Sequence, residues 1–299
     1  MSNQMTAQKL KFSAAIATPT YQKFISQTLG DKKKAERYTA AIMSAVATNP
    51  QLQQCEAKTI LSGSLLAESL GLAHSPQLGQ YYLVPFKVKE KNGIPQHYDA
   101  TFVLGYKGYI QLAGRSGQYR HINAMEIKQG ELAYYNPFDD EIELNPIQDF
   151  DERQKAETVG YYAMLEYLNG FKKVLYWSKK QMLQHADKYS PAFSAQAYEK
   201  LLNGEIPQNE LWKYSSFWYK DFDGMAKKTM LRQLISKWGV MSTDMVQALE
   251  SDNAVMNVSG SEFIPTIPVE EPEMPAEPET PAEPETVDNI VEEVDIDAI

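Results

Sequence analysis

Apolar residues along the chain follow two periods. Some segments place them three or four residues apart, the spacing of one helix face, as Tyr38, Ile42 and Val46 do. Other segments alternate apolar and polar residues, which is typical of a half-buried strand. Helical spacing predicts helices over residues 35–48, 56–70, 106–114, 178–188, 195–203 and 209–238. Alternation predicts strands over residues 80–88, 98–104, 119–128, 132–135, 159–167 and 171–177.

Asn-Gly pairs lie between strands at two places. Asn92-Gly93 separates the first two predicted strands, and Asn169-Gly170 separates the last two. Because Asn-Gly favours the tight turn of a hairpin, both strand pairs are predicted to be antiparallel hairpins. Strands and helices that come in groups, without regular alternation, indicate an α+β fold. We therefore expect a small antiparallel β-sheet with a long β-hairpin, flanked by helices.

The last predicted helix carries apolar residues on two different faces. Leu211, Trp218 and Phe222 share a face in its first half, and the apolar positions of its second half lie elsewhere. One straight helix cannot bury both faces. A break or kink is predicted at Asp223-Gly224.

Both ends differ from the body in composition. Residues 1–34 are polar and weakly patterned, which predicts a mobile N-terminal arm before a body over residues 35–250. Residues 251–299 are rich in Pro and Glu, which predicts an acidic disordered tail. Within the tail, residues 287–299 contain apolar residues at helical spacing, which predicts a partner-docking segment. A purely solubilising tail is the alternative.

Charge is divided between body and tail. The last 49 residues hold 14 Asp and Glu and no Lys or Arg, so the formal net charge of -10 belongs to the tail. The remaining 25 acidic and all 29 basic residues leave the body at about +4. A cationic body with an acidic appendage is typical of nucleic-acid-binding proteins that also recruit partners.

The cellular compartment follows from what the sequence lacks. Cys55 is the only cysteine, so no internal disulfide can form, which fits a reducing compartment. Residues 1–16 contain no apolar run behind a basic start, and no stretch approaches the about 18 apolar residues of a membrane span. We expect a soluble cytoplasmic protein without a membrane partner.

Common cofactor motifs are missing from the sequence. Neither the phosphate-binding loop of ATPases nor the glycine fingerprint of dinucleotide-binding proteins occurs, which disfavours an ATP-driven recombinase. The four histidines are far apart and do not form a zinc motif. Two acidic groups, residues 139–143 and 149–152, have the oxygen ligands that suit Mg²⁺, but acidic loops are usually solvated. No metal site and no required cofactor are predicted.

A nuclease is one alternative function. Glu126 and Lys128 share a predicted strand that follows Asp99, and an Asp with Glu-x-Lys on strands can hold Mg²⁺ for phosphodiester hydrolysis. Three residues at such loose spacing often match by chance. The hypothesis predicts strand cleavage, which is testable.

Basic and aromatic residues interleave in two segments. The first is the motif Gly105-Tyr106-Lys107-Gly108-Tyr109, which continues to Arg115 and Arg120. The second is residues 211–234, where basic residues lie off the apolar faces. Lysine and arginine neutralise phosphates, and aromatic rings stack on bases. The candidate DNA-binding residues are Tyr106, Lys107, Tyr109, Arg115, Arg120, Lys213, Lys220, Lys227, Lys228 and Arg232.

Residues 225–234 read Met-Ala-Lys-Lys-Thr-Met-Leu-Arg-Gln-Leu, and the body also contains Gly105-Tyr106-Lys107-Gly108, Tyr161-Tyr162 and Ser178-Lys179. In these motifs the chain resembles RecT-family phage single-strand annealing proteins. The resemblance extends over roughly residues 35–245 and is closest at residues 225–234. By position it implies phosphate contacts by Lys107, Arg115, Arg120, Lys227, Lys228 and Arg232.

The resemblance also implies an activity and partners. Such proteins coat single-stranded DNA and form rings or helical filaments with a basic groove. They anneal complementary strands in homologous recombination without ATP and without bond-breaking chemistry, in a Mg²⁺-dependent way. A 5′ to 3′ exonuclease and a host single-strand-binding protein are the implied partners, in the cytosol of a bacterium carrying a phage or prophage. A passive DNA-binding scaffold remains a third alternative, which predicts binding without faster annealing.

Overall fold

The computed structural model describes residues 12–88, 96–259 and 262–266. Its α-helices are α1 (Phe12–Ile16), α2 (Pro19–Leu29), α3 (Lys32–Ala47), α4 (Ala57–Ser69), α5 (Tyr106–Arg115), α6 (Phe150–Lys155), α7 (Lys179–Tyr189), α8 (Ala195–Leu202), α9 (Phe217–Lys220), α10 (Phe222–Trp238) and α11 (Thr243–Ser251). Its strands are β1 (Tyr81–Val88), β2 (His97–Leu104), β3 (Tyr119–Lys128), β4 (Leu132–Asn136), β5 (Glu141–Leu144), β6 (Thr158–Tyr167), β7 (Lys172–Ser178), β8 (Ala254–Ser259) and β9 (Glu262–Thr266). Short 3-10 helices are η1 (Leu52–Gln54), η2 (Pro76–Leu78) and η3 (Gln208–Lys213).

The first sheet contains the predicted hairpin β1–β2. The strands pair antiparallel from Tyr81 opposite Leu104 to Val88 opposite His97. The predicted turn at Asn92-Gly93 lies outside the described residues. β8 and β9 extend the sheet in the order β1-β2-β8-β9, and α4 packs on it through fully buried residues such as Ile60.

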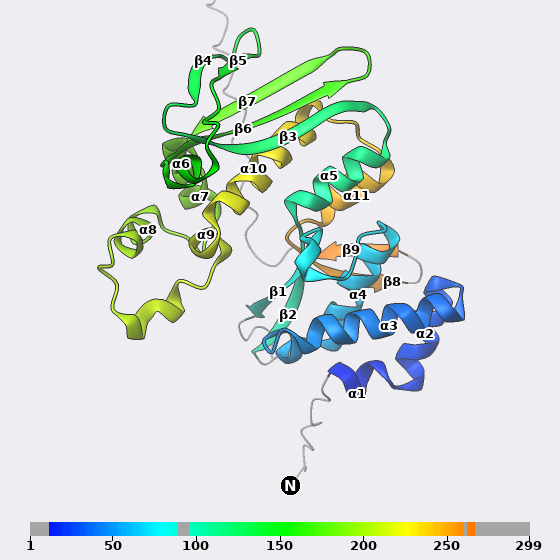
Figure 1. Cartoon of the computed structure of the whole chain (residues 1–299). Coiled ribbons are helices and arrows are strands. Elements are labelled where there is room, and N and C mark those ends of the chain that lie inside the picture. The colour runs from blue at the N-terminus through cyan, green and yellow to red at the C-terminus, as the bar shows by residue number, and fades with distance from the viewer. Residues whose placement is uncertain (1–11, 89–95, 260–261, 267–299) are drawn as a thin grey trace, which may run out of the picture.

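The second sheet has the order β3-β6-β7 and contains the long hairpin β6–β7. Tyr161 on β6 pairs with Trp177 on β7, and Gly170 in the turn has a φ of 89°, which glycine adopts without strain. α10 runs diagonally along this sheet, with α1 to α3 at the opposite end of the molecule (Figure 1). Leu231 and Leu234 of α10 are fully buried.

One hydrophobic core joins the two sheets. It extends from Phe12 in α1 through Phe102 and Leu165 in the sheets to Met256 in β8. The prediction of an α+β fold with small antiparallel sheets and flanking helices is confirmed. No helix within the described ranges is long and apolar enough to cross a membrane.

The N-terminal segment differs from the predicted arm. From Phe12 onward it forms α1, α2 and the first turn of α3. Ile16 and Ile25 are almost completely buried, because these short helices pack against α3 and α4. The first 11 residues lie outside the described residues. Weak periodicity therefore reflected short helices rather than missing structure.

The C-terminal boundary also differs from the predicted one at residue 250. Asp252, Ala254 and Met256 are buried, and β8 pairs with β2 through Thr101 opposite Val255. The fold therefore continues to at least Thr266. Charge placed Asp252 in the acidic tail, although its side chain belongs to the core. The predicted docking segment, residues 287–299, lies outside the described residues.

Two further segments differ locally. The polar, acidic stretch 136–157, for which no helix or strand was predicted, contains β5 and α6. The break near residue 223 occurs two residues earlier, at Asp221, which ends α9 and begins α10. The Asp221 carboxylate accepts a hydrogen bond from the Gly224 amide across 2.9 Å. This N-cap explains why Gly224 lies inside the helix rather than at the break.

Candidate nucleic-acid interface

Glycines set how closely α5 approaches the turn before β1. A β-carbon at Gly105 would lie 2.1 Å from the carbonyl oxygen of Gly79, and one at Gly108 would lie 2.1 Å from that of Gln80. No side chain fits at such distances, so both positions require glycine. The Gly105 amide also donates to the Gln80 carbonyl across 2.9 Å. This contact fixes the first turn of α5, which carries Lys107.

The side chains of Tyr82 and Lys107 both lie close to Gly79. A β-carbon on Gly79 would lie 3.1 Å from the Tyr82 hydroxyl oxygen and 3.5 Å from Cδ of Lys107. Gly79 has a φ of 65°, in the left-handed region. Lys107 is exposed and forms no ion pair with any other residue that the structure describes. Its charge is therefore available to an external anion.

The junction of α9 and α10 brings Phe217 and Lys220 to the same region. The ring centroids of Phe217 and Tyr82 are 5.8 Å apart. Phe217 is 48% exposed. Lys220 is exposed, and no described carboxylate pairs with it. Burial, and then the proximity of Tyr106 and Asp221, raises the pKa of the Tyr82 hydroxyl.

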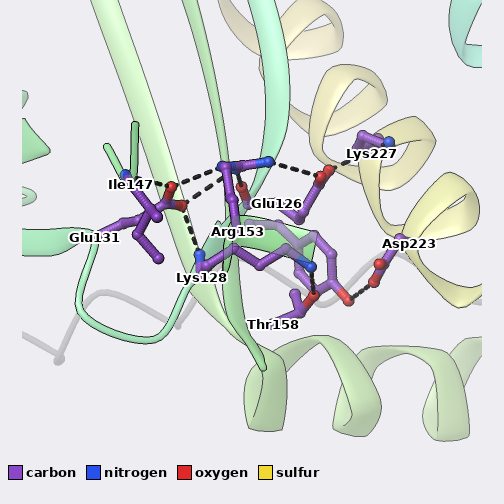
Figure 2. Close-up of polar contacts among 9 residues, drawn as sticks. Glu126, Lys128, Glu131, Ile147, Arg153, Thr158, Asp223 and Lys227 are labelled. Atoms are coloured by element: carbon purple, nitrogen blue, oxygen red, sulfur yellow. Dashed lines mark hydrogen bonds and ion pairs between the residues drawn. The ribbon is translucent and has the colours of Figure 1, made fainter. Parts of the chain in front are cut away.

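Lys227 joins α10 to this region. Its Nζ lies 5.7 Å from the ring centroid of Tyr106, within the range of a cation–π interaction. It also lies 3.3 Å from Oε2 of Glu126 on β3 (Figure 2). We define the α5–α10 surface as the side chains of Tyr82, Tyr106, Lys107, Phe217, Lys220 and Lys227.

Arg153 of α6 lies between two glutamates near the end of β3 (Figure 2). Its Nε donates to Oε1 of Glu131 across 2.7 Å, and its Nη1 lies 3.4 Å from Oε1 of Glu126. Burial alone would raise the pKa of Glu126, but a backbone hydrogen bond and the charges of Lys227 and Arg153 lower it. Glu126 is therefore an ionised partner that holds Lys227 at the edge of the α5–α10 surface.

Three other predicted DNA-binding residues, Tyr109, Lys228 and Arg232, contact Asp252. The Asp252 carboxylate lies 3.0 Å from Nζ of Lys228 and 2.8 Å from Nη1 of Arg232. It accepts hydrogen bonds from the Tyr109 hydroxyl across 2.9 Å and from the Leu104 amide across 2.8 Å. Lys228 is 7% exposed and Tyr109 is fully buried, so neither is open to a phosphate in this structure, whereas the Arg232 side chain is 39% exposed.

We define the Asp252 cluster as the side chains of Tyr109, Lys228, Arg232 and Asp252, and its charges oppose the effect of burial on pKa. Complete burial would raise the pKa of Asp252, but the charges of Lys228 and Arg232 and the hydrogen bonds lower it below its ordinary value. Burial lowers the pKa of Lys228, although Asp252 opposes that shift. The cluster pairs one carboxylate with the side chains of Lys228 and Arg232, and it links α5, α10 and the start of β8.

The remaining predicted contacts are exposed but have intramolecular partners. The Arg115 guanidinium donates to the carbonyls of Leu70 and Gly71 at the end of α4. Arg120 pairs with Glu166 across 3.1 Å, and Lys213 pairs with Glu210 across 3.0 Å. Of the ten predicted residues, the structure places Lys107 and Lys227 near the ring of Tyr106, and Lys220 on α9 beside Phe217. It places Tyr109, Lys228 and Arg232 in the Asp252 cluster.

Comparison with known proteins decides which kind of molecule this is. A family model described as the RecT family matches residues 36–267. The chain belongs to the RecT family. It is 35% identical over 234 residues to the uncharacterized protein YqaK of Bacillus subtilis (strain 168), an alignment that covers 78% of this chain and 69% of that protein. It is 26% identical over 239 residues to Protein RecT of Escherichia coli (strain K12), covering 79% and 78%.

RecT-family membership implies DNA binding and single-strand annealing in recombination. The members of the family are annealing proteins and are not known as nucleases. Asp99 lies on β2, whereas Glu126 and Lys128 lie on β3 of the other sheet. The negative charge of Glu126 is compensated by ion pairs with Lys227 and Arg153. Within the described part of the chain, no three His, Cys, Asp or Glu side chains are placed to hold a metal ion.

Sequence reasoning missed the partners of the predicted cations. Asp252 was hidden by its position in an acidic stretch, and Glu126 was weighed only as a metal ligand. Tyr82 lay in a predicted strand and Phe217 in a predicted helix, and neither was among the candidate DNA-binding residues. A usable signal for Phe217 was its place beside Lys220 in a segment with apolar residues on more than one face.

Proposed function

We propose that this RecT-family protein anneals complementary DNA strands in phage homologous recombination without ATP, as an oligomeric ring or filament. The α5–α10 surface contributes to its basic groove. Lys107 and Lys220 are the observation that carries this proposal, because both are exposed and neither has a carboxylate partner among the described residues. Family membership supports the annealing activity.

The physics of annealing favours contacts to the DNA backbone. Two strands repel each other through their phosphates, so the protein must neutralise phosphates while it leaves the Watson-Crick edges free to pair. Lysines that reach phosphates do this without sequence preference. The α5–α10 surface offers such lysines beside aromatic rings and requires no bond-breaking chemistry.

Oligomerisation is part of the proposed mechanism because one subunit carries little positive charge. Residues 267–299 hold 12 of the 39 acidic residues, so residues 1–266 carry 27 acidic against 29 basic residues, a net charge of about +2. Repetition of the α5–α10 surface along a ring or filament multiplies this weak charge.

Cofactors and partners complete the proposal. No nucleotide or metal is required, and Mg²⁺ modulates annealing. The acidic C-terminal segment recruits a 5′ to 3′ exonuclease or a host single-strand-binding protein in the bacterial cytosol. The excess of acidic residues and the absence of basic ones in residues 267–299 support a recruiting role rather than a DNA contact.

Fluorescence-monitored annealing of complementary oligonucleotides tests this proposal. The purified protein should accelerate pairing to the same extent with and without ATP, and a denaturing gel should show strands of unchanged length. Binding without acceleration would support the passive scaffold instead. Shortened strands that disappear in Glu126→Ala would support the nuclease.

A further inference from the structure

We propose that Phe217 and Tyr82 form a base-stacking site, at which an unpaired base of single-stranded DNA lies against Phe217 while Lys107 and Lys220 neutralise the flanking phosphates. This inference rests on the proposed function and assigns a role to two rings that no phosphate contact requires. It assigns a protein contact to a DNA base, in addition to the contacts assigned to the phosphates.

Phe217 is the first reason for this assignment. Nearly half of its surface, 48%, is exposed, although its ring already contacts Tyr82 at a centroid distance of 5.8 Å. An exposed phenyl ring held by a second ring is a preformed platform, since little side-chain freedom remains to be lost on binding. Each nucleobase has a face that stacks on such a ring, whatever its sequence.

The surroundings of the two rings select the kind of occupant. Lys220 lies three residues after Phe217 in the same helix, and the side chains of Lys107 and Tyr82 both lie close to Gly79. Neither lysine has a carboxylate partner among the described residues. An apolar protein segment would leave these ammonium groups without partners, whereas single-stranded DNA offers both base faces and phosphates.

The chemistry of Tyr82 is compatible with a nearby polyanion. A tyrosine hydroxyl is neutral at physiological pH, and burial, together with Tyr106 and Asp221, raises the pKa of the Tyr82 hydroxyl further. Stacking also leaves the Watson-Crick edge of the base free. A base that is stacked at this site can therefore still pair with its complement.

Abasic DNA separates stacking from phosphate contact. Binding is measured for oligo(dT) and for a strand of the same length in which every base is missing. Phe217→Ala should weaken oligo(dT) binding by about five- to hundredfold, the range for loss of one stacked base, and should leave binding of the abasic strand unchanged. Phe217→Leu should behave like the alanine variant, because leucine has no ring on which a base can stack.

Phe171 provides the matched control. It is 45% exposed and also contacts a tyrosine ring, Tyr167, at 5.5 Å, but it lies at the turn of the β6–β7 hairpin. Phe171→Ala should leave oligo(dT) binding unchanged. Circular dichroism and light scattering establish that each variant is folded and has the wild-type oligomeric mass.

Several results would overturn the stacking site. These are unchanged oligo(dT) binding by Phe217→Ala, an equal loss on the abasic strand, rescue by leucine, or a changed oligomeric mass, which would assign Phe217 to a subunit interface. A wild-type protein that binds neither strand would instead contradict the proposed function itself.

Discussion

Nζ of Lys228 lies 3.0 Å from the Asp252 carboxylate in a pair that is almost completely buried. Lys228 belongs to the segment of closest RecT resemblance, and Asp252 lies beyond the predicted end of the body. The pair therefore ties α10 to the start of β8, an inner strand of the first sheet. Its main consequence is for stability, because both charges have been removed from water.

Removal of Asp252 should destabilise the fold strongly. Asp252→Ala leaves Lys228 buried without its anion, so we expect a loss of about 3–5 kcal/mol in the free energy of unfolding. Lys228→Met should cost less, because Arg232, Tyr109 and the Leu104 amide still satisfy Asp252. Urea denaturation measures both values. Equal or negligible losses would contradict the assigned role of the carboxylate.

The pH dependence of stability should report the same carboxylate. The pKa of Asp252 is lower in the folded protein than in the unfolded chain, so its contribution is present above about pH 4 and is lost as pH falls through the folded value. The difference in stability between wild type and Asp252→Asn should shrink on going from pH 7 to pH 3. Urea titrations at several pH values test this, and a constant difference would argue against it.

Two shortened chains test where the body ends. A chain that ends after residue 250 lacks Asp252 and the β8–β9 pair, so we expect it not to fold stably. A chain that ends after residue 267 keeps both. Circular dichroism and thermal unfolding separate these expectations, and a stable fold without residues 251–267 would contradict the observed packing of β8.

Charge in the C-terminal segment should weaken DNA binding. The chain ending after residue 267 loses 12 negative charges and should bind single-stranded DNA more tightly than the full chain at low salt. The difference should shrink as salt rises, because screening shortens the range of repulsion. Fluorescence anisotropy at increasing salt measures it. A salt-independent difference would show that charge is not the cause.

Glu126 offers a test that also distinguishes the nuclease. Glu126→Gln removes the anion that lies 3.3 Å from Lys227, while Arg153 keeps Glu131 as a partner (Figure 2). The freed Lys227 should raise DNA affinity at low salt by up to about fivefold, the size of a partly exposed ion pair. A nuclease would instead lose strand cleavage, which a denaturing gel detects.

Much of the fold could be predicted because its elements are locally encoded. The helix α5, the hairpins β1–β2 and β6–β7 and the N-terminal part of the body follow from periodicity and Asn-Gly turns. The two ends could not be predicted, since Ile16 and Asp252 are buried by partners distant in sequence. The composition of a segment indicates solvent exposure only on average, so it cannot identify a single buried carboxylate.

The candidate site was predictable in residue type but not in arrangement. The sequence indicated basic residues on α5 and α10, but helical spacing could not tell Lys227, which faces Tyr106 and Glu126, from Lys228, which faces Asp252. The two are neighbours in sequence and point to different surroundings because successive helical residues lie about 100° apart.

The salt dependence of DNA binding tests which lysines contact phosphates. Lys107→Ala and Lys220→Ala should each lower the slope of log affinity against log salt by about 0.7, the value for one contact to a single strand. Lys23→Ala, an exposed lysine on α2, serves as the matched control and should leave the slope unchanged. Lys228→Ala should lower the free energy of unfolding and should change the salt slope little, because its ammonium already pairs with Asp252.

The annealing rate of the double variant Lys107→Ala/Lys220→Ala tests the central claim most directly. Complementary fluorescent oligonucleotides are mixed with wild-type protein or with the folded double variant, in the absence of nucleotide. The account predicts that the wild type accelerates annealing and that the double variant loses about tenfold or more of that acceleration, with strands of unchanged length. Annealing by the double variant at the wild-type rate would contradict the assignment of the α5–α10 surface to DNA.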